Sequence, residues 1–301
     1  DCGNASSEFV QTITVTDNTD PIIEIAATDT TVDCFEIPVI EVPQPKSASI
    51  TNPFIEWLNN NGGALASDDC GQVTWSNDFE DFTNGECGNT GYATVTFTAT
   101  DECGNTASTI ATFTIQDTTA PAFVEILPQD TTVNCDAVPE METLTATDNC
   151  GTAEVTADAD TIQSETCLAN YTIVRTWVAE DECGNTTSHT QNIIVQDTVA
   201  PVLTEGASIP QGESGIDGCI SVIPAGPSEE EIAALFEDNC SNIVVTKSVV
   251  SEELQSTDCN WSVTYNYTIA DECGNLAEEI NVTYSGSDRT APILIGVPDN
   301  T

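Results

Sequence analysis

Apolar and polar residues alternate with a period of two over many short stretches of this chain. In "YATVTFTATD" (92–101) threonines occupy one face, and the other face carries Ala93, Val95, Phe97 and Ala99. The stretches "YTIVRTWVAED" (171–181) and "VTYNYTIADE" (263–272) occupy equivalent places in the chain. A period of two is typical of β-strands with one buried face, so the pattern predicts an all-β protein built from short strands.

Two segments are predicted to be helical instead. In "NPFIEWLNNNGG" (52–63), Pro53 suits the first helical turn and glycines follow the last one. In "GPSEEEIAALFED" (226–238), Ser228 is placed to cap the helix and Glu231 to complete a capping box.

The string "DECGN" occurs at 101–105, 181–185 and 271–275, and a shortened "DCGN" stands at 1–4. Each copy leads into an alternating stretch and an aspartate-containing linker that ends in proline: "QTITVTDNTDP" (11–21), "ATFTIQDTTAP" (111–121), "QNIIVQDTVAP" (191–201) and "NVTYSGSDRTAP" (281–292). Self-similarity at this spacing indicates tandem repeats. We expect whole repeats at 20–118, 119–198 and 199–289, the last strands of a preceding repeat at 1–19, and the start of a following one at 290–301.

Strands of this length in a unit of 80 to 100 residues predict the fold class: all-β, tandem immunoglobulin-like β-sandwich repeats with two disulfides each and short helical insertions in repeats 1 and 3.

The charge balance excludes some partners. The chain has 4 Lys plus Arg against 50 Asp plus Glu, a formal net charge of −46. Nucleic acid and anionic membranes are therefore not expected as partners, because both are bound through clustered basic residues. The excess of acid is typical of calcium-binding surface proteins and also of proteins adapted to high salt. The sequence has no apolar run of membrane-spanning length, so we expect no membrane insertion by this segment.

Thirteen cysteines without a C-x-x-C pair indicate an extracellular disulfide framework rather than a zinc site. Every whole repeat has four cysteines, and the strand directions place the first and third at one end of the repeat and the second and fourth at the other. Cysteines at opposite ends of a long strand cannot bond. The resulting prediction pairs Cys34 with Cys87, Cys70 with Cys103, Cys135 with Cys167, Cys150 with Cys183, Cys219 with Cys259 and Cys240 with Cys273. Cys2 is left over, and we expect its mate in a preceding repeat.

Acidic residues should converge where one repeat joins the next. The predicted groups are Asp17 with Asp68, Asp69 and Asp101; Asp117 with Asp148 and Asp181; and Asp197 with Asp238 and Asp271. Oxygen-only clusters with several carboxylates suit Ca²⁺, so we predict calcium sites at these junctions and no organic cofactor. The alternative is that these aspartates serve the backbone turns next to the cysteines.

Catalytic signatures are absent from the sequence. His189 is the only histidine, which argues against a histidine-based triad or a multi-histidine metal site. The four tryptophans lie in different elements and are expected in the cores rather than on a sugar-binding surface: Trp57, Trp75, Trp177 and Trp261. We therefore expect a protein that is not an enzyme.

The combined motif resembles a known family. "DTTVxC" at 29–34 and 130–135, "DNCG" in mid-repeat and "DECGN" followed by "DTTAP" are similar to the hyalin-repeat-like (HYR-like, Ig-like) domains of giant Bacteroidota cell-surface adhesins of the SprB gliding-motility type. Repeat 3 departs from the pattern with "GIDGC" at 215–219 and "DNCS" at 238–241. The resemblance implies type IX secretion, an extracellular filament attached at the outer membrane, and a role in cell adhesion or gliding. It also nominates O-glycan acceptors after aspartate: Thr30, Thr118, Thr131, Thr161 and Thr198.

Two functional hypotheses lead at this point, and a third, the accessory array of a secreted enzyme, has less support from the sequence. The first is a non-catalytic structural segment, a stalk or filament, whose partners are the neighbouring repeats of the same chain. The second is a module that itself binds an external polysaccharide or a solid surface through one of the repeats. An exposed aromatic cluster around Phe54 and Trp57 would favour the second.

Overall fold

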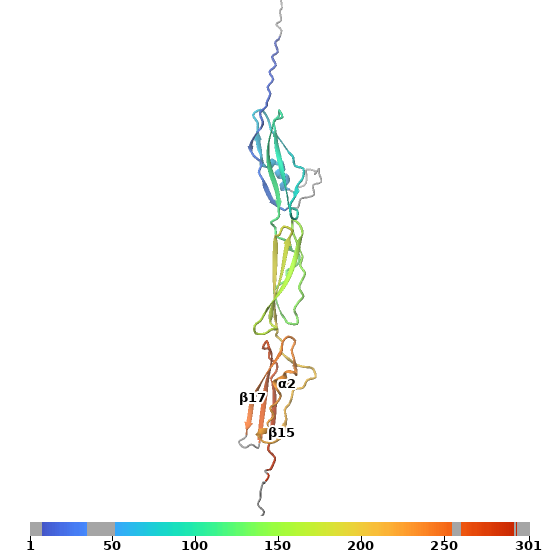
Figure 1. Ribbon diagram of the computed structural model, residues 1–301, viewed down its shortest axis with the longest axis vertical. Coiled ribbons are helices and arrows are strands. Elements are labelled where there is room, and N and C mark those ends of the chain that lie inside the picture. The colour runs from blue at the N-terminus through green and yellow to red at the C-terminus, as the bar shows by residue number, and fades with distance from the viewer. Residues whose placement is uncertain (1–7, 35–51, 255–259, 292, 294–301) are drawn as a thin grey trace, which may run out of the picture. The chain divides into compact units, whose positions relative to one another are not determined.

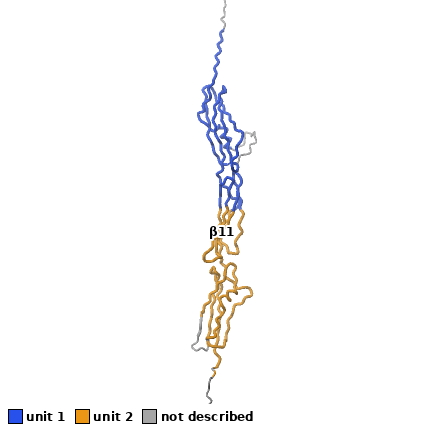
Figure 2. The backbone as a smooth tube through the Cα atoms, in the orientation of Figure 1, with its two compact units in different colours: residues 1–126, 144–156, 178–188 blue, residues 127–143, 157–177, 189–301 orange. Residues whose placement is uncertain are grey.

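The computed structural model describes residues 8–34, 52–254, 260–291 and 293, in two compact units. Unit 1 comprises residues 1–126, 144–156 and 178–188, and unit 2 comprises 127–143, 157–177 and 189–301 (Figure 2). The predicted repeat 119–198 thus contributes residues to both units. The predicted repeat boundaries stay predictions, and we keep the names repeat 1, 2 and 3 for the ranges given above.

The described chain is all-β apart from two short α-helices and two 3₁₀ turns (Figure 1). The strands in residues 20–118 are β1 (Ile22–Ile25), β2 (Thr30–Asp33), β3 (Leu65–Ser67), β4 (Thr74–Asn77), β5 (Thr83–Asn84), β6 (Gly91–Thr100) and β7 (Thr106–Gln116). Those in 119–198 are β8 (Ala122–Phe123), β9 (Thr131–Asn134), β10 (Ala146–Thr147), β11 (Ala153–Gln163), β12 (Tyr171–Asp181) and β13 (Thr186–Gln196). Those in 199–289 are β14 (Val202–Leu203), β15 (Ser214–Asp217), β16 (Phe236–Glu237), β17 (Ile243–Leu254), β18 (Asn260–Asp271) and β19 (Ile280–Ser287).

One sheet topology occurs three times, as expected for tandem immunoglobulin-like sandwiches. The larger sheets have the orders β2-β7-β6-β4, β9-β13-β12-β11 and β15-β19-β18-β17, and in the first of them β5 also pairs with β6. The smaller sheets are the antiparallel pairs β1–β3, β8–β10 and β14–β16. The fold-class prediction is confirmed, except that no disulfide in the described residues lies within a single repeat.

In each larger sheet the strand that comes first in the chain pairs parallel with the strand that comes last: β2 with β7, β9 with β13 and β15 with β19. Asp33 at the end of β2 is opposite Gln116 at the end of β7, and Asn134 of β9 is opposite Gln196 of β13. The next residues, Cys34 and Cys135, therefore lie at the end of the sheet where the chain leaves for the next repeat. The "DECGN" turns join the last two strands at the opposite end.

The alternation predicted for 92–101 is confirmed. Along β6 the side chains of Val95, Phe97 and Ala99 have no exposed area, while the intervening threonines are exposed or half-buried. In repeat 3 the core contains Ile232 from the helical insertion together with Tyr267 and Ile269 of β18. Burial of the apolar face is what stabilises these sheets.

Both helical insertions form as predicted. Helix α1 (Pro53–Asn59) begins with proline after Asn52, whose side chain accepts from the N–H groups of Phe54 and Ile55, and the 3₁₀ turn η1 (Asn61–Gly63) follows. Helix α2 (Glu229–Ala233) has the complete capping box between Ser228 and Glu231, and the 3₁₀ turn η2 (Ile220–Val222) precedes it. Helix α2 packs beside β17 and β18 (Figure 1).

The tryptophans belong to the cores. Trp57 and Phe54 are 8% and 1% exposed, and Trp57 packs edge-on against Phe97 with ring centroids 5.2 Å apart. Trp177 and Trp261 are also buried, and Trp75 packs partly buried against the repeat 1 core. His189 stacks on Trp177, with ring centroids 5.9 Å apart. The prediction that the tryptophans are core residues is confirmed.

Candidate functional site at the junctions

The polar residues that recur in every repeat, above all the aspartates and the "DECGN" turns, lie around the linkers between repeats. We call the residues around linker 117–121 the first junction, which lies in unit 1, and those around linker 197–201 the second junction, which lies in unit 2. We call Asp17, Asp117 and Asp197 the linker aspartates. Each accepts a hydrogen bond from the backbone two residues later: Asp17 from Thr19 (3.0 Å), Asp117 from Thr119 (3.1 Å) and Asp197 from Val199 (3.2 Å).

The aspartate of each "DECGN" turn organises that turn. Asp181 Oδ1 accepts from the N–H groups of Cys183 (2.8 Å) and Asn185 (2.9 Å), and its Oδ2 accepts from the Asn185 side chain (2.9 Å). Asp101 makes the same three bonds, and Asp271 makes the two with its asparagine. The glycines of the three turns have φ values of 95°, 87° and 92°, a conformation that disfavours a side chain.

The asparagine of each "DECGN" turn fixes the linker that enters the repeat. Its side-chain N–H donates to the carbonyl of a linker aspartate: Asn105 to Asp17 (3.4 Å), Asn185 to Asp117 (3.4 Å) and Asn275 to Asp197 (3.1 Å). The same contact at three places shows that the turn recognises the backbone of the incoming linker. Sequence reasoning missed this role, because the string alone does not show what faces the turn.

The glutamate of the turn in repeat 2 bonds to the repeat before it. Glu182 accepts from the backbone N–H of Gly88 (3.0 Å) and from the hydroxyl of Thr152 (2.6 Å). The bonds from Thr152 and then Gly88 lower the pKa of the Glu182 carboxyl, despite some desolvation. Asn89 N–H also donates to the Cys150 carbonyl (2.7 Å).

Gly88 permits this close approach at the first junction. Its φ is 50°, and a Cβ at this position would lie 2.6 Å from the Cys150 carbonyl oxygen. No other residue type could occupy this position without displacing the neighbouring loop. The sequence signal was the string "ECGN" at 86–89, a copy of the turn motif without its first aspartate, which we did not single out from the sequence.

Two disulfides fasten each junction. At the first junction Cys34 bonds to Cys150 and Cys87 to Cys183, with Cα atoms 5.3 and 5.1 Å apart. At the second junction the bonds are Cys135–Cys240 and Cys167–Cys273, with Cα atoms 6.1 and 5.0 Å apart. Their partners are 96 to 116 residues apart in sequence. In the chain-entropy model a closed loop of about 100 residues contributes about 4.7 kcal/mol.

This pattern corrects our pairing prediction. The pairs Cys34–Cys87, Cys135–Cys167, Cys150–Cys183 and Cys240–Cys273 are wrong, because each of these cysteines bonds to the adjacent repeat. The pair Cys70–Cys103 is also wrong, since both residues are unpaired and exposed in the described chain. The pair Cys219–Cys259 cannot be judged, because Cys259 lies outside the described residues, as does Cys2.

The physical reason for the error lies in where two repeats meet. The strand directions gave the correct end of the repeat for each cysteine. At a junction, however, the leaving end of one repeat adjoins the entering end of the next, so four cysteines meet there. An argument from strand direction cannot distinguish bonds within an end from bonds across the junction.

The structure brings together part of each predicted acidic group. Ligand atoms within 4.8 Å of one another are offered by Asp17, Asp68 and Cys70; by Asp117, Asp181 and Cys183; and by Asp197, Asp271 and Cys273. Cys183 and Cys273 are in disulfides and offer no thiolate. Of the other predicted members, Asp69 and Asp101 are outside the first of these groups, Asp148 is outside the second and Asp238 is outside the third.

Two aspartates of the mid-repeat loops keep an unused oxygen. Asp148 Oδ1 accepts from Cys150 N–H (2.7 Å), and Asp238 Oδ1 accepts from Cys240 N–H (2.9 Å). The Oδ2 atoms of both are buried and have no hydrogen-bond partner in the structure. A buried carboxylate oxygen without a donor is costly, which makes these two atoms suitable cation ligands.

The surroundings of Asp117, the linker aspartate of the first junction, disfavour the ionised form of its carboxyl group. Burial raises the pKa of the Asp117 carboxyl, against the hydrogen bond from Thr119, and the carboxylates of Asp148 and Asp181 raise it further. At the second junction the Ser241 hydroxyl donates to Asp197 Oδ2 (2.6 Å). Repeat 2 has Gly151 at that position, so the first junction lacks this donor.

The alternative interpretation was that these aspartates serve the backbone turns next to the cysteines. The structure also supports it, since the carboxylates of Asp101, Asp181 and Asp271 accept hydrogen bonds within their own turns. A carboxylate oxygen has further lone pairs, so turn bonding and cation binding are compatible. The ligand atoms that the aspartates offer at the junctions are carboxylate oxygens, which fit Ca²⁺.

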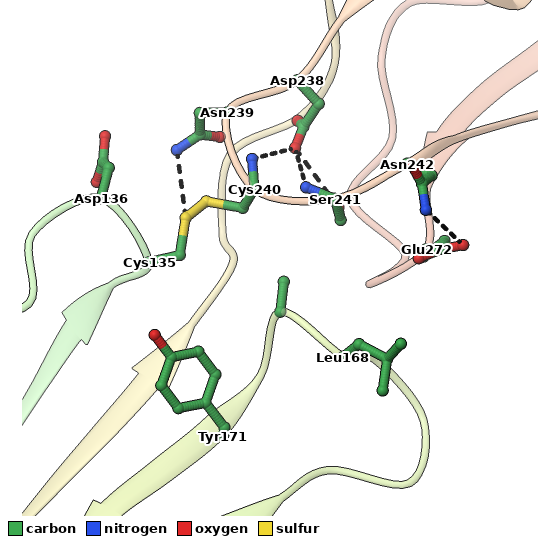
Figure 3. A pocket seen from close by; sticks show the side chains of 11 residues that line it. Cys135, Asp136, Leu168, Tyr171, Asp238, Asn239, Cys240, Ser241, Asn242 and Glu272 are labelled. Carbon is green, nitrogen blue, oxygen red and sulfur yellow. Dashed lines mark hydrogen bonds between the residues drawn. A yellow bond between two sulfur atoms is a disulfide. The ribbon is translucent and has the colours of Figure 1, made fainter. Parts of the chain in front are cut away.

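A hollow of about 630 Å³ lies beside the second-junction disulfide (Figure 3). The 238–242 loop and the Cys135–Cys240 bond form one side, and Leu168 and Tyr171 lie across from them (Figure 3). Its lining carries carboxylates and amides but no histidine, and the Ser241 hydroxyl in it donates to the carboxylates of Asp197 and Asp238. We find no catalytic constellation in this hollow.

No aromatic surface for sugar binding is seen in the described residues. The large aromatic side chains that are exposed there are Phe9 and Tyr92, and Phe54 and Trp57 are buried. The observation that would have favoured a carbohydrate-binding repeat is therefore missing.

The nominated glycan acceptors differ in accessibility. Thr118, Thr161 and Thr198 are exposed, whereas Thr30 in β2 and Thr131 in β9 are half-buried. The Thr118 hydroxyl donates to Asp33 Oδ2 (2.7 Å). Glycosylation at these sites stays a prediction.

Comparison with known proteins finds similarity to solved structures of cadherin repeats. No family model and no curated protein matches the chain. Among solved structures, the chain is similar to mouse cadherin-23 EC22-24 (16% identity, TM-score 0.29, covering 90% of this chain and 99% of that one) and to protocadherin gammaB7 EC3-6 (12%, 0.27, 90% and 78%). It also matches the protocadherin gammaB4 extracellular domain (12%, 0.28), of which it spans 50%. At these values the similarities carry no argument about function. In the described residues no helix is long and apolar enough to cross a membrane.

Proposed function

We propose that the chain is a structural, non-catalytic segment of a large secreted cell-surface adhesin, a stalk that transmits tension from one repeat to the next. The observation that carries this proposal is the pair of disulfides at each junction. A linker alone would connect successive repeats by one covalent path. The two disulfides add two more paths, so tension is shared among three.

The noncovalent contacts support the same role. At each junction the "DECGN" turn binds the linker carbonyl, and at the first junction Glu182 and Asn89 add bonds between the two repeats. Such contacts orient each repeat on its neighbour. Arrays whose units bind only their neighbours suit a spacer that presents an adhesive tip.

Calcium is the cation we assign to the junctions. Asp117 and Asp148, with Asp181, would hold it at the first junction, and Asp197 and Asp238, with Asp271, at the second. Bound Ca²⁺ would supply positive charge to the unpartnered Oδ2 atoms and relieve the repulsion around Asp117. Asp17 and Asp68 would hold a third ion at the start of repeat 1.

The location, export route and biological role that we propose for the protein follow from the resemblance of its motifs to those of the adhesin family. We infer an extracellular, outer-membrane-attached protein exported by the type IX pathway that acts in adhesion or gliding. External polysaccharide or a solid surface would then be bound elsewhere in the polypeptide.

The cation hypothesis is tested with Asp117→Asn, which keeps the acceptor for Thr119 and removes the charge. A raised pKa means that ionisation of Asp117 lowers stability as the pH rises through that pKa. Without divalent ions the variant should therefore be more stable than wild type at pH 7. With Ca²⁺ at about 100 times its dissociation constant, wild type should gain about 2.7 kcal/mol, and the variant should gain less.

The measurement is thermal unfolding with calcium and with chelator, together with calorimetric titration. Asp158→Asn, an exposed position in β11, is the matched control and should behave like wild type. Equal calcium responses in Asp117→Asn and wild type would contradict the assignment of calcium to the first junction.

A further inference from the structure

The disulfides at the two junctions follow one rule. The cysteine after the first strand bonds to the cysteine of the mid-repeat loop in the next repeat, as in Cys34–Cys150 and Cys135–Cys240. The cysteine before the last hairpin bonds to the "DECGN" cysteine of the next repeat, as in Cys87–Cys183 and Cys167–Cys273. Repeats 2 and 3, which each follow another repeat, therefore have two acceptor cysteines at the entering end.

Cys70 and Cys103 occupy these acceptor positions in repeat 1. The Cys70 N–H donates to Asp68 Oδ1 (2.8 Å), as the N–H of Cys150 does to Asp148 (2.7 Å). The Cys103 N–H donates to Asp101 Oδ1 (2.8 Å), as the N–H of Cys183 does to Asp181 (2.8 Å). The loops that hold these two thiols are thus built like those that hold the disulfides.

The state of the two thiols differs from that of their counterparts. Cys70 and Cys103 are both unpaired and exposed, whereas Cys150 is completely buried and Cys183 is half-buried. Asn105 already donates to the carbonyl of linker aspartate Asp17. The entering end of repeat 1 therefore has the turn and the linker contact of a junction, without the two bonds.

We propose that Cys70 and Cys103 form a two-point covalent docking surface for another repeat of the same kind, which presents cysteines where Cys34 and Cys87 stand. The partner is an immunoglobulin-like repeat directly preceding residue 20 in tandem. This inference extends the proposed stalk function, on which it rests for the tandem arrangement, by naming the covalent partner of repeat 1.

Each bond forms by oxidation of two thiols to one disulfide. The two thiols lose two protons and two electrons, and a disulfide oxidant such as oxidised glutathione accepts them and becomes two thiols. The carboxylate of Asp17 raises the pKa of the Cys70 thiol, which lowers the thiolate fraction at neutral pH. Refolding is therefore done in mildly alkaline buffer.

The experiment replaces residues 1–19 of the chain with one whole repeat. A copy of residues 20–119, with its own acceptor cysteines changed to serine, is placed ahead of residue 20 of the chain. The protein is refolded with reduced and oxidised glutathione, and its disulfides are mapped by mass spectrometry of nonreduced peptides. We expect peptides joining Cys34 of the copy to Cys70 and Cys87 of the copy to Cys103.

The control is the same extended chain with Cys70→Ser. It should keep the bond from Cys87 of the copy to Cys103 and leave Cys34 of the copy open to alkylation. A Cys70–Cys103 peptide, two thiols that remain alkylatable, or bonds between separate chains would each overturn the proposal.

The native bonds Cys34–Cys150 and Cys167–Cys273 serve as the internal reference in the same digest. If they are present while the new bonds are missing, the docking surface is refuted and the stalk proposal survives. If the reference bonds are also missing, the covalent junctions on which the proposed function rests are refuted as well.

Discussion

The disulfide pattern limits how far the chain can be stretched, and this limit can be calculated. In the oxidised chain the shortest covalent route follows segment 1–34, crosses to segment 150–167 through Cys34–Cys150, and crosses to segment 273–301 through Cys167–Cys273. At about 3.4 Å per residue this route is about 270 Å long, against about 1,000 Å for the reduced chain. Reduction should therefore release about 750 Å of hidden length.

The assay is single-molecule force spectroscopy with handles at the two ends of the chain, before and after reduction. Pairing within repeats predicts a different length. The shortest route would then follow segments 1–34, 87–150, 183–219 and 259–301. These segments together correspond to about 590 Å in the oxidised chain. A measured oxidised length near this value would refute the pairing between repeats.

A double variant gives a second calculated length. With Cys34→Ser and Cys150→Ser, the shortest route follows segment 1–87, runs back from Cys183 to Cys167, and ends with segment 273–301. The oxidised length should then be about 440 Å, which is about 180 Å more than in wild type. An unchanged length would mean that Cys34–Cys150 does not carry the tension.

Three further outcomes follow from single side chains. Gly88→Ala should destabilise the first junction by more than the roughly 1–2 kcal/mol of backbone strain expected for Gly104→Ala, because only Gly88 faces the Cys150 carbonyl; denaturant unfolding compares the two, and equal losses would contradict the contact. Trp57→Ala should cost about 3–5 kcal/mol because Trp57 is a core residue, with no change in a glycan-array profile; lost glycan binding at unchanged stability would revive the carbohydrate-binding hypothesis. Glu182→Gln should lower stability at neutral pH, and the difference from wild type should shrink as the pH falls through the lowered pKa of Glu182, since a depressed pKa gives stability that is present above the ordinary pKa. Glu180→Gln in the preceding strand β12 is the control, and a pH-independent difference would remove the charge from the explanation.

The sequence predicted what depends on neighbours within one strand or one helical turn. The alternation in β6 placed Val95 and Phe97 in the core, and the capping box at Ser228 and Glu231 formed as expected. These features follow from local periodicity and hydrogen bonding, which do not require knowledge of the rest of the molecule.

The junction chemistry could be predicted only in part. The string "DECGN" indicated a turn with a glycine at positive φ, and the aspartate groups were placed near the linkers. The partners of Cys183, Glu182 and Asn185 could not be deduced, because all three reach residues 68 to 96 positions away. A repeated string shows that its positions matter but not which surface they face.

The recurrence of "DECGN" now has a physical account at the first junction. Asp181 orders the turn, Glu182 accepts from the preceding repeat, Cys183 bonds to it, Gly184 provides the backbone conformation and Asn185 holds the linker. Three of these five residues act on a neighbouring repeat or its linker.

A string with these roles recurs because every junction needs the same contacts: the turn at the entering end of one repeat bonds to the repeat before it and to the linker between them. The compact units agree with this, since each contains one whole junction while residues 119–198 are divided between the two. The structural unit that the repeated string encodes is thus the junction, in which the leaving end of one repeat and the entering end of the next are folded and bonded together.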